Sequence, residues 1–244
     1  MRIMLTTAAI ILSAAAILWF QNERIEKKTG RSEDDCSSDR FCSYDELAGE
    51  YEEGEDYEIV KSRSGDDRWL VSAIHGGGIE ETTSSLTEAI AGSSYPFYAF
   101  KGRLTSNNYS NLHITSTRFD EPQALKMVAD TKFHISIHGA SGDKLQTMIG
   151  GLDEELKQIV KQHLENKGFT VIEAPENLDG DHPDNYVNQT KTGQGVQIEI
   201  TRAQRKAFYK DGDISYQSRK DSSNETEEFK AYVEAIQAAM KDYD

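Results

Sequence analysis

Five short runs of β-branched and aromatic residues recur along the chain and alternate with longer amphipathic stretches. They are WLVSAIH (69–75), FYAFKG (97–102), HISIHG (134–139), FTVIEA (169–174) and GVQIEITR (195–202). Residues of these types favour the pleated, half-buried surface of a sheet. Strands that alternate with helices predict an α/β fold, with an open, twisted mixed sheet covered by helices on both faces. In such a sheet ligands gather outside the carboxyl ends of the strands, so we expect the site there.

Three of the intervening stretches carry helix signals. Residues 120–130 begin with Asp120 as the expected N-cap and have Pro122 in the first turn. Residues 152–168 place one apolar stripe on a helix that stops at Gly168, and residues 226–243 place another; the stripes are Leu156, Ile159, Val160 and Leu164, and Phe229, Tyr232, Val233, Ile236 and Met240. The second stripe predicts packing against the sheet rather than chemistry.

The first 43 residues differ in composition from the rest. An apolar run over residues 3–20 fits either a cleaved signal peptide or an uncleaved membrane anchor within residues 1–22. Residues 23–43 are polar and charged, which predicts a spacer. One catalytic domain is expected over residues 44–244, because a chain of 244 residues leaves little room for two. We therefore expect an extracellular or cell-surface monomer, associated with the membrane through residues 3–20 if the run is kept.

Charge and cysteine content limit the possible binding partners and the redox compartment of the protein. The net charge of −15 argues against a nucleic-acid partner, and the acidic segment YEEGEDYE (51–58) predicts a solvated face. The two cysteines, Cys36 and Cys42, suit an oxidising compartment, where a small-loop disulfide and two idle thiols are both open readings. A zinc clip is disfavoured, because no histidine or further cysteine accompanies them.

Three expected strands carry polar groups suited to metal or proton chemistry near their carboxyl ends: His75, His138 and Glu199. Taken singly, each has a structural alternative, namely a hydrogen-bonded histidine or a glutamate on the wet face of a strand. Their occurrence at comparable positions on three strands favours a shared site. Gly139 follows His138 and is expected to let a substrate backbone approach closely.

The segment HGGGIE supplies a further ligand. Its three glycines, residues 76–78, can take positive φ and fold the chain back, so that Glu80 approaches His75. Two imidazoles and one carboxylate, from His75, His138 and Glu80, form the His₂Glu set of catalytic zinc sites. The competing interpretation of HGGG is an oxyanion hole of the lipase type, but the sequence contains no G-x-S-x-G nucleophile motif. Phosphate binding by the glycines is also disfavoured, because the sequence contains neither the Walker lysine pattern nor G-x-G-x-x-G.

Several blocks in fixed order resemble the poly-γ-glutamate hydrolases of bacteriophages and bacilli. They are HGGGIE, LHITSTRFDEP (112–122), SIHG (136–139), PENLDG (175–180), PDN (183–185) and GVQIEITR, and they span about Tyr44 to Arg205. The resemblance implies a zinc carboxypeptidase-like fold and one zinc ion per chain, held by His75, Glu80 and His138. It implies Glu199 as the catalytic glutamate.

The resemblance also suggests roles for other residues. Arg118 would lie near a substrate carboxylate or the developing oxyanion, and His113, Asn185 and Asn188 would contact substrate, although a structural hydrogen bond is an equal alternative for His113. His134 faces the same side as His138 and is a candidate hydrogen-bond partner of the ligands. One departure is Gln189, which follows Asn188 where the family pattern has arginine.

The function that the residues and the resemblance together imply is zinc-dependent hydrolysis with Glu199 as general base; the resemblance implies γ-glutamyl amide bonds of poly-γ-glutamate as the substrate and endo action as the mode. A zinc amidase acting on other γ-linked or cell-wall peptides would use the same four residues. A surface-anchored polyanion-binding protein is the non-enzymatic alternative. Because the polymer and the chain are both acidic, binding requires a local positive groove, for which Arg118, Arg202, Arg205 and Lys206 are candidates.

Overall fold

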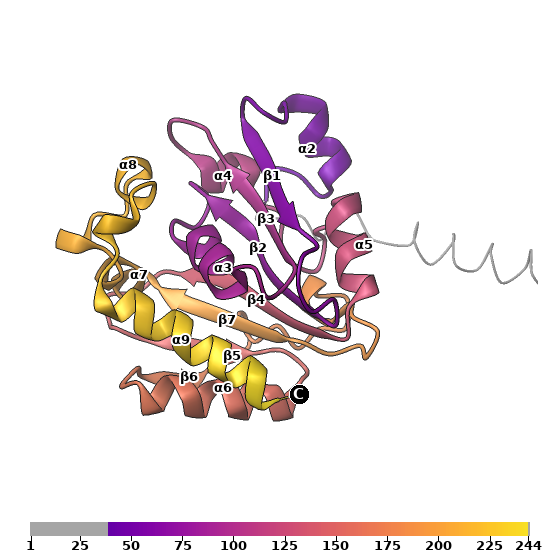
Figure 1. Ribbon diagram of the computed structural model, residues 1–244. Helices are drawn as coiled ribbons and strands as arrows, with labels where there is room; N and C mark the ends of the chain where they lie inside the picture. Colours follow the sequence, from indigo (N-terminus) through magenta and orange to yellow (C-terminus); the bar gives the residue numbers. More distant parts are fainter. Residues whose placement is uncertain (1–38, 244) are drawn as a thin grey trace, which may run out of the picture. The chain divides into compact units, whose positions relative to one another are not determined.

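The computed structural model describes residues 39–243, which contain a seven-stranded sheet (Figure 1). The strand order is β1-β3-β2-β4-β7-β5-β6. The strands are β1 (Tyr57–Ser62), β2 (Trp69–Gly77), β3 (Phe97–Gly102), β4 (Phe133–Ala140), β5 (Thr147–Gly150), β6 (Val171–Glu173) and β7 (Val196–Thr201). Strands β3, β2, β4 and β7 are parallel, whereas β1 and β5 run antiparallel to their neighbours β3 and β7. The predicted mixed sheet is therefore confirmed.

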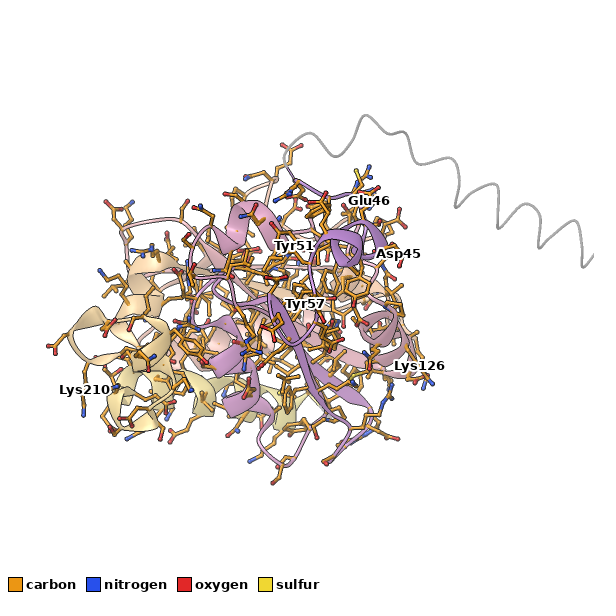
Figure 2. All side chains as sticks on the ribbon, turned by 90° about the horizontal axis from the view of Figure 1, so that it is seen from above. Asp45, Glu46, Tyr51, Tyr57, Lys126 and Lys210 are labelled. Atoms are coloured by element: carbon orange, nitrogen blue, oxygen red, sulfur yellow. The ribbon has the colours of Figure 1, made fainter. Side chains whose placement is uncertain are left out.

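Helices cover both faces of the sheet, as expected. One face packs against α3 (Thr83–Ala91), α6 (Glu154–Asn166) and α9 (Glu227–Asp242), through a core that includes Val71, Ile135 and Ile198. The other packs against α2 (Tyr44–Glu50), α4 (Asn108–Leu112) and α5 (Pro122–Asp130). Figure 2 shows Asp45 and Glu46 of α2 at the outer surface. Acidic side chains in the first turn of a helix stabilise it through their interaction with the helix dipole. The remaining helices are α7 (Arg202–Ala207), α8 (Tyr216–Arg219), η2 (Tyr186–Asn188), η3 (Lys210–Gly212) and η4 (Ser222–Asn224).

All five predicted strands exist, but the sequence analysis missed β1 and β5. Strand β1 begins inside the acidic segment 51–58, whose Glu52, Glu53 and Glu55 are exposed, as predicted for a solvated face. Its Tyr57 is 2% exposed and stacks on Phe100, with ring centroids 4.9 Å apart. Strand β5 has only four residues, too few to show an alternating pattern.

The predicted helices are confirmed as α5, α6 and α9, with one different cap. The N-cap of α5 is Glu121, whose carboxylate accepts from the N–H groups of Gln123 and Ala124, and not Asp120. The Asp120 carboxylate instead accepts from the Tyr44 N–H at 2.6 Å, which ties α2 to this segment. Gly168 has a φ of +89° just beyond α6, as expected for a helix stop.

The order of the strands creates a topological switch point between β2 and β4. From β2 the chain passes through α3 to β3, and from β3 it passes through α4 and α5 to β4, on the other side of β2. The two connections lie on opposite faces of the sheet. The carboxyl ends of β2 and β4 therefore flank a switch point, which is where open α/β sheets bind ligands.

Residues 39–43 belong to the folded domain and not to the predicted spacer. Phe41 is 5% exposed and meets Tyr51 edge-on, and the Asp39 carboxylate bonds to His113 and Thr115. Cys42 is disulfide-bonded. The signal or anchor, the remainder of the spacer and Cys36 lie outside the described residues. Within residues 39–243 there is no helix long and apolar enough to cross a membrane.

A Phe41→Ala substitution should lower the free energy of unfolding by about 3–5 kcal/mol, because it opens a cavity in the core beneath α2. The matched control is Leu145→Ala, which removes a side chain from a residue that is 58% exposed and should change stability by less than about 0.5 kcal/mol. Urea denaturation under oxidising conditions measures both. Equal, small effects of the two substitutions would show that residues 39–43 do not contribute to the core.

Candidate metal centre and active site

A β-bulge brings His75 to the face of the sheet where the site forms. The pairing of β2 with β3 shifts between Ala73 and Gly76, so that Ile74 and His75 together oppose Phe100. Strict alternation would turn the two side chains to opposite faces. In the structure, Ile74 packs in the core with Phe100, and the His75 ring lies beside His138 of β4. Both histidines are 2% exposed.

The HGGGIE segment folds back as expected, because the Glu80 N–H donates to the His75 carbonyl at 2.9 Å. Of the three glycines, only Gly77 has a positive φ, +66°. Gly78 is needed for space instead, since a Cβ there would lie 2.5 Å from Nδ2 of Asn108. The resulting turn returns the Glu80 carboxylate to the carboxyl end of β2.

Three side-chain groups converge at this point. Nδ1 of His75 lies 3.2 Å from Nδ1 of His138 and 3.4 Å from Oε1 of Glu80, and Oε2 of Glu80 lies 3.8 Å from Nδ1 of His138. The His75 Nε2–H donates to the Ile114 carbonyl at 2.9 Å, which leaves its Nδ1 atom facing the cluster. The structure thus brings together the ligand set predicted from the sequence.

His113 offers a competing third ligand. A nitrogen of His113 and ligand atoms of His75 and Glu80 lie within 4.8 Å of one another. However, the His113 ring stacks on His75 at a centroid distance of 4.1 Å and an angle of 32°, whereas the rings of His75 and His138 meet at 75°. Lone pairs lie in the ring plane, so the steeper angle lets two of them meet at one point. We therefore favour His138 as the third ligand.

Charges in this buried cluster compensate one another. Burial would raise the pKa of Glu80, but His75, His138 and the Gly139 N–H, which donates to Oε2 at 2.7 Å, bring that pKa to about 2. Burial would lower the pKa of His75, but the Glu80 carboxylate more than offsets this and raises it. Burial and the nearby His75 lower the pKa of His138 to about 3, so its ring is neutral, the form that binds metals.

Glu199 lies beside the ligands on the next strand. It is the direct register partner of His138 in the β4–β7 pair, so the two side chains share a face of the sheet. It is 4% exposed, and its Oε1 accepts from Nε2 of Gln197 at 3.1 Å. Burial and the Glu80 carboxylate raise the pKa of Glu199 well above its usual range, while Arg205 opposes the shift. A buried carboxylate with a raised pKa next to a candidate metal centre suits proton transfer.

Arg205 has a more central position than the sequence indicated. Its guanidinium donates to the carbonyls of Ile200, Ala140 and Glu81, and so ties the ends of β7 and β4 to the turn that carries Glu80. A Cβ on Gly139 would lie 2.8 Å from the Arg205 Cζ. The space beside Gly139 is therefore filled by Arg205, which corrects our expectation that a substrate backbone would enter there.

The asparagines predicted to bind substrate serve the fold. Asn188 is 2% exposed; its amide donates to the carbonyls of Gly180 and His182, and its oxygen accepts from the Leu152 N–H. Asn185 caps η2 through the Val187 N–H and donates to Oε1 of Gln197, the residue that holds Glu199. Both amides are engaged within the protein, and a contact of either residue with substrate stays a prediction.

The remaining predicted residues lie in the α4–α5 connection and directly after η2. The Arg118 side chain is 7% exposed, and its role at an oxyanion stays a prediction. Nδ1 of His113 donates to Oδ1 of Asp39 at 2.6 Å, so a structural hydrogen bond is present there. Gln189, which replaces the expected arginine, donates to the Asp184 carbonyl.

Sequence reasoning missed Asp39 and Tyr109. Asp39 was assigned to the spacer, although its carboxylate orients His113. Tyr109 is 54% exposed and stacks on the other side of His113, with ring centroids 4.5 Å apart. Burial and the carboxylates of Glu80, Asp39 and Glu199 raise the pKa of Tyr109, as expected for a phenol near the site. The sequence does carry one signal for buried polar groups. Polar and apolar residues alternate over 133–138, which places His134, Ser136 and His138 on one face of a strand.

Known proteins are similar to this chain in both sequence and structure. A model of the family described as poly-gamma-glutamate hydrolase matches residues 41–235. UPF0714 protein YmaC of Bacillus subtilis (strain 168) is 33% identical over 243 residues, 99% of this chain and 98% of YmaC. The structure of a bacteriophage poly-gamma-glutamate hydrolase has a TM-score of 0.80 at 35% identity, and a zinc-free apo form of YndL has 0.75 at 33%; each comparison covers 84% of this chain and 98% of the other. The chain therefore has a zinc carboxypeptidase-like α/β fold and belongs to the poly-γ-glutamate hydrolase family.

Proposed function

We propose that this protein is a zinc-dependent hydrolase that cuts γ-glutamyl amide bonds within chains of poly-γ-glutamate. The observation that supports this most is the convergence of two imidazole nitrogens and a carboxylate, from His75, His138 and Glu80, within 3.2–3.8 Å of one another. Membership of the family supports the polymer as substrate. Cutting within the chain, rather than from its end, is the part of the proposal that rests on the resemblance alone.

The donor set fits zinc. Catalytic zinc sites hold the ion with three protein ligands, often two histidines and one glutamate, and keep one position for water or substrate. A zinc ion bound there would polarise the scissile carbonyl and lower the pKa of water towards about 7. The Ile114 carbonyl and the Ser136 hydroxyl occupy Nε2 of His75 and His138, which leaves both Nδ1 atoms for the ion.

Glu199 acts as the general base and then as the general acid. Its carboxylate takes a proton from the attacking water and returns it to the amine that leaves, so the amide is cleaved with no net change in the enzyme. Gln197 fixes one carboxylate oxygen through its amide, and Arg205 favours the charged form of Glu199. Burial keeps bulk water away from the proton that is transferred.

The polymer is a polyanion, so the net charge of −15 opposes its approach. Of the four basic residues considered for a positive groove, Arg118 and Arg205 are buried, whereas Arg202 and Lys206 are exposed on α7. Helix α7 starts directly after β7, the strand of Glu199. We therefore assign the first contact with the polymer to Arg202 and Lys206.

Metal removal should stop polymer cleavage. Poly-γ-glutamate incubated with the protein should shorten on a gel, a chelator should abolish the shortening, and added zinc should restore it. Average length should fall before small products accumulate, because cuts within the chain halve long molecules. Shortening that survives complete metal removal would contradict the zinc requirement. Early release of small products at nearly constant polymer length would contradict endo action, and faster turnover of short muropeptides would favour a zinc amidase with another substrate.

A Glu199→Gln substitution should reduce kcat by about 10²- to 10⁴-fold, the usual contribution of general acid–base catalysis. The amide keeps an oxygen that can accept from Gln197 but cannot take up a proton. Zinc content should stay at the wild-type value, unlike that of Glu80→Gln. Glu173→Gln, at a carboxylate that is 62% exposed at the sheet edge, is the matched control and should retain activity. Full hydrolysis by Glu199→Gln would remove the proposed mechanism.

Moderate salt should speed cleavage of the polymer. Raising ionic strength from about 0.01 M to 0.15 M shortens the Debye length from about 30 Å to about 8 Å and screens the repulsion between two acidic molecules. We expect kcat/KM to rise about tenfold, at the low end of the range over which surface fields change association rates. A γ-linked oligomer with blocked α-carboxyl groups should show no such rise. A steep fall with the polymer would mean that local attraction outweighs the net charge.

A further inference from the structure

Three rings lie against one another in a stack that runs from the metal ligands to the surface. The His75 and His113 rings have centroids 4.1 Å apart at an angle of 32°, and the His113 and Tyr109 rings have centroids 4.5 Å apart at 28°. His75 is 2% exposed, whereas Tyr109 is 54% exposed. Because His113 covers one face of the Tyr109 ring, the opposite face is open to solvent.

The Tyr109 ring is held in place by its neighbours. Nδ1 of His113 donates to Oδ1 of Asp39 at 2.6 Å, and the Thr115 N–H donates to Oδ2 of the same carboxylate at 2.7 Å. Tyr109 itself lies in α4, which closes with the His113 N–H donating to the Tyr109 carbonyl at 3.2 Å. The exposed ring is therefore already ordered, so a ligand that binds it has little side-chain freedom to remove.

Tyr109 and the exposed basic residues lie on opposite sides of the metal ligands. The strand order β3-β2-β4-β7 puts the ligand strands β2 and β4 in the middle. Helix α4, with Tyr109, follows and contacts β3, while α7, with Arg202 and Lys206, follows and contacts β7. A polymer that touches both helices crosses the carboxyl edge of the sheet with the metal ligands between its two contacts.

Charge does not favour a polyanion on the Tyr109 side of this path. Burial, and then the carboxylates of Glu80, Asp39 and Glu199, raise the pKa of Tyr109. The phenol is therefore neutral wherever these carboxylates are charged, and the same carboxylates repel an anionic chain. An uncharged ring can contact the polymer here without adding to that repulsion.

The linkage between glutamyl units determines what such a ring can contact. In a γ-linked chain, two methylene groups lie in the main chain between the α-carbon and the next amide carbonyl, so the main chain has an apolar stretch. In an α-linked chain a single carbon separates successive peptide groups. A ring laid on that main chain would desolvate amides, which is unfavourable, whereas a ring on methylenes buries apolar surface.

We propose that the exposed face of Tyr109 binds the main-chain methylenes of a glutamyl unit beside the cleaved bond and so selects γ-linked over α-linked chains. The proposal rests on the polymer hydrolysis argued above, and it names the residue that recognises the linkage. The His113 ring separates Tyr109 from His75, so Tyr109 contacts a bound unit and not the atoms that react. It therefore contributes to binding of the chain and not to the chemical step.

The test measures equilibrium binding to the full, zinc-loaded chain carrying Glu199→Gln, which holds substrate with little cleavage. Hexamers of γ-linked and of α-linked glutamate have the same composition and charge, and calorimetric titration gives both dissociation constants. Tyr109→Ala should weaken binding of the γ-linked hexamer about tenfold, the loss expected for roughly two buried methylenes. Binding of the α-linked hexamer should change less than about twofold. In the active enzyme, the same substitution should raise KM about tenfold and leave kcat unchanged.

Two further variants serve as controls. Tyr216→Ala is the matched control, because Tyr216 lies on α8, is 55% exposed and should leave both dissociation constants unchanged. Tyr109→Phe keeps the ring and should keep the affinity for the γ-linked hexamer within about twofold. Zinc affinity, measured by competition with a chelator, should be the same in all of these variants.

The outcomes separate the two proposals. A wild type that does not cleave the polymer would overturn the proposed function. Cleavage by the wild type, with an affinity for the γ-linked hexamer that Tyr109→Ala leaves unchanged, would overturn the linkage role alone. Equal weakening of the two isomers, or equal losses in Tyr109→Ala and Tyr109→Phe, would also overturn it. Weaker zinc binding by Tyr109→Ala would show that the ring supports His75 through His113 instead.

Discussion

The carboxylate of Glu80 is the group around which the site is arranged. Glu80 is 7% exposed, and a charge this enclosed persists only with compensating partners. Those partners come from three elements: His75 at the bulge of β2, His138 and the Gly139 N–H on β4, and Arg205 of α7, whose guanidinium packs against Gly139. The bulge and the start of α7 each bring a partner to this carboxylate, and the glycine turn brings the carboxylate to these partners.

The two faces of the sheet that holds the site differ in polarity. One face of β4 and β7 is apolar and packs on α6 and α9, while the other carries a polar row in which each group pairs with the next. Such a row orients the ligands because its members have no water with which to exchange. Asn185 and Val187 extend it to η2, because Asn185 donates to Gln197 and the Val187 carbonyl contacts His134.

Much of the fold was predictable from local pattern, and much of the site from spacing. Long β-branched runs and capped amphipathic helices carry their own signals, whereas four-residue β5 and the acid-rich start of β1 depend on the strands beside them. The cluster of His75, Glu80 and His138 could be named from the sequence as a candidate ligand set. The extra residue in β2 that turns His75 inward is apparent only when β2 is paired with β3. The roles of Asp39 and Arg205 arise from contacts with residues far away in the chain, which composition does not encode.

The most direct test of the central claim is the position of zinc in crystals of the metal-loaded protein, located by anomalous scattering at the zinc absorption edge. The account predicts one peak bonded to Nδ1 of His75, Nδ1 of His138 and the Glu80 carboxylate, with Glu199 adjacent but not bonded. A peak bonded to His113 in place of His138 would contradict the ligand set. The absence of any peak at this cluster under saturating zinc would contradict the metal site itself.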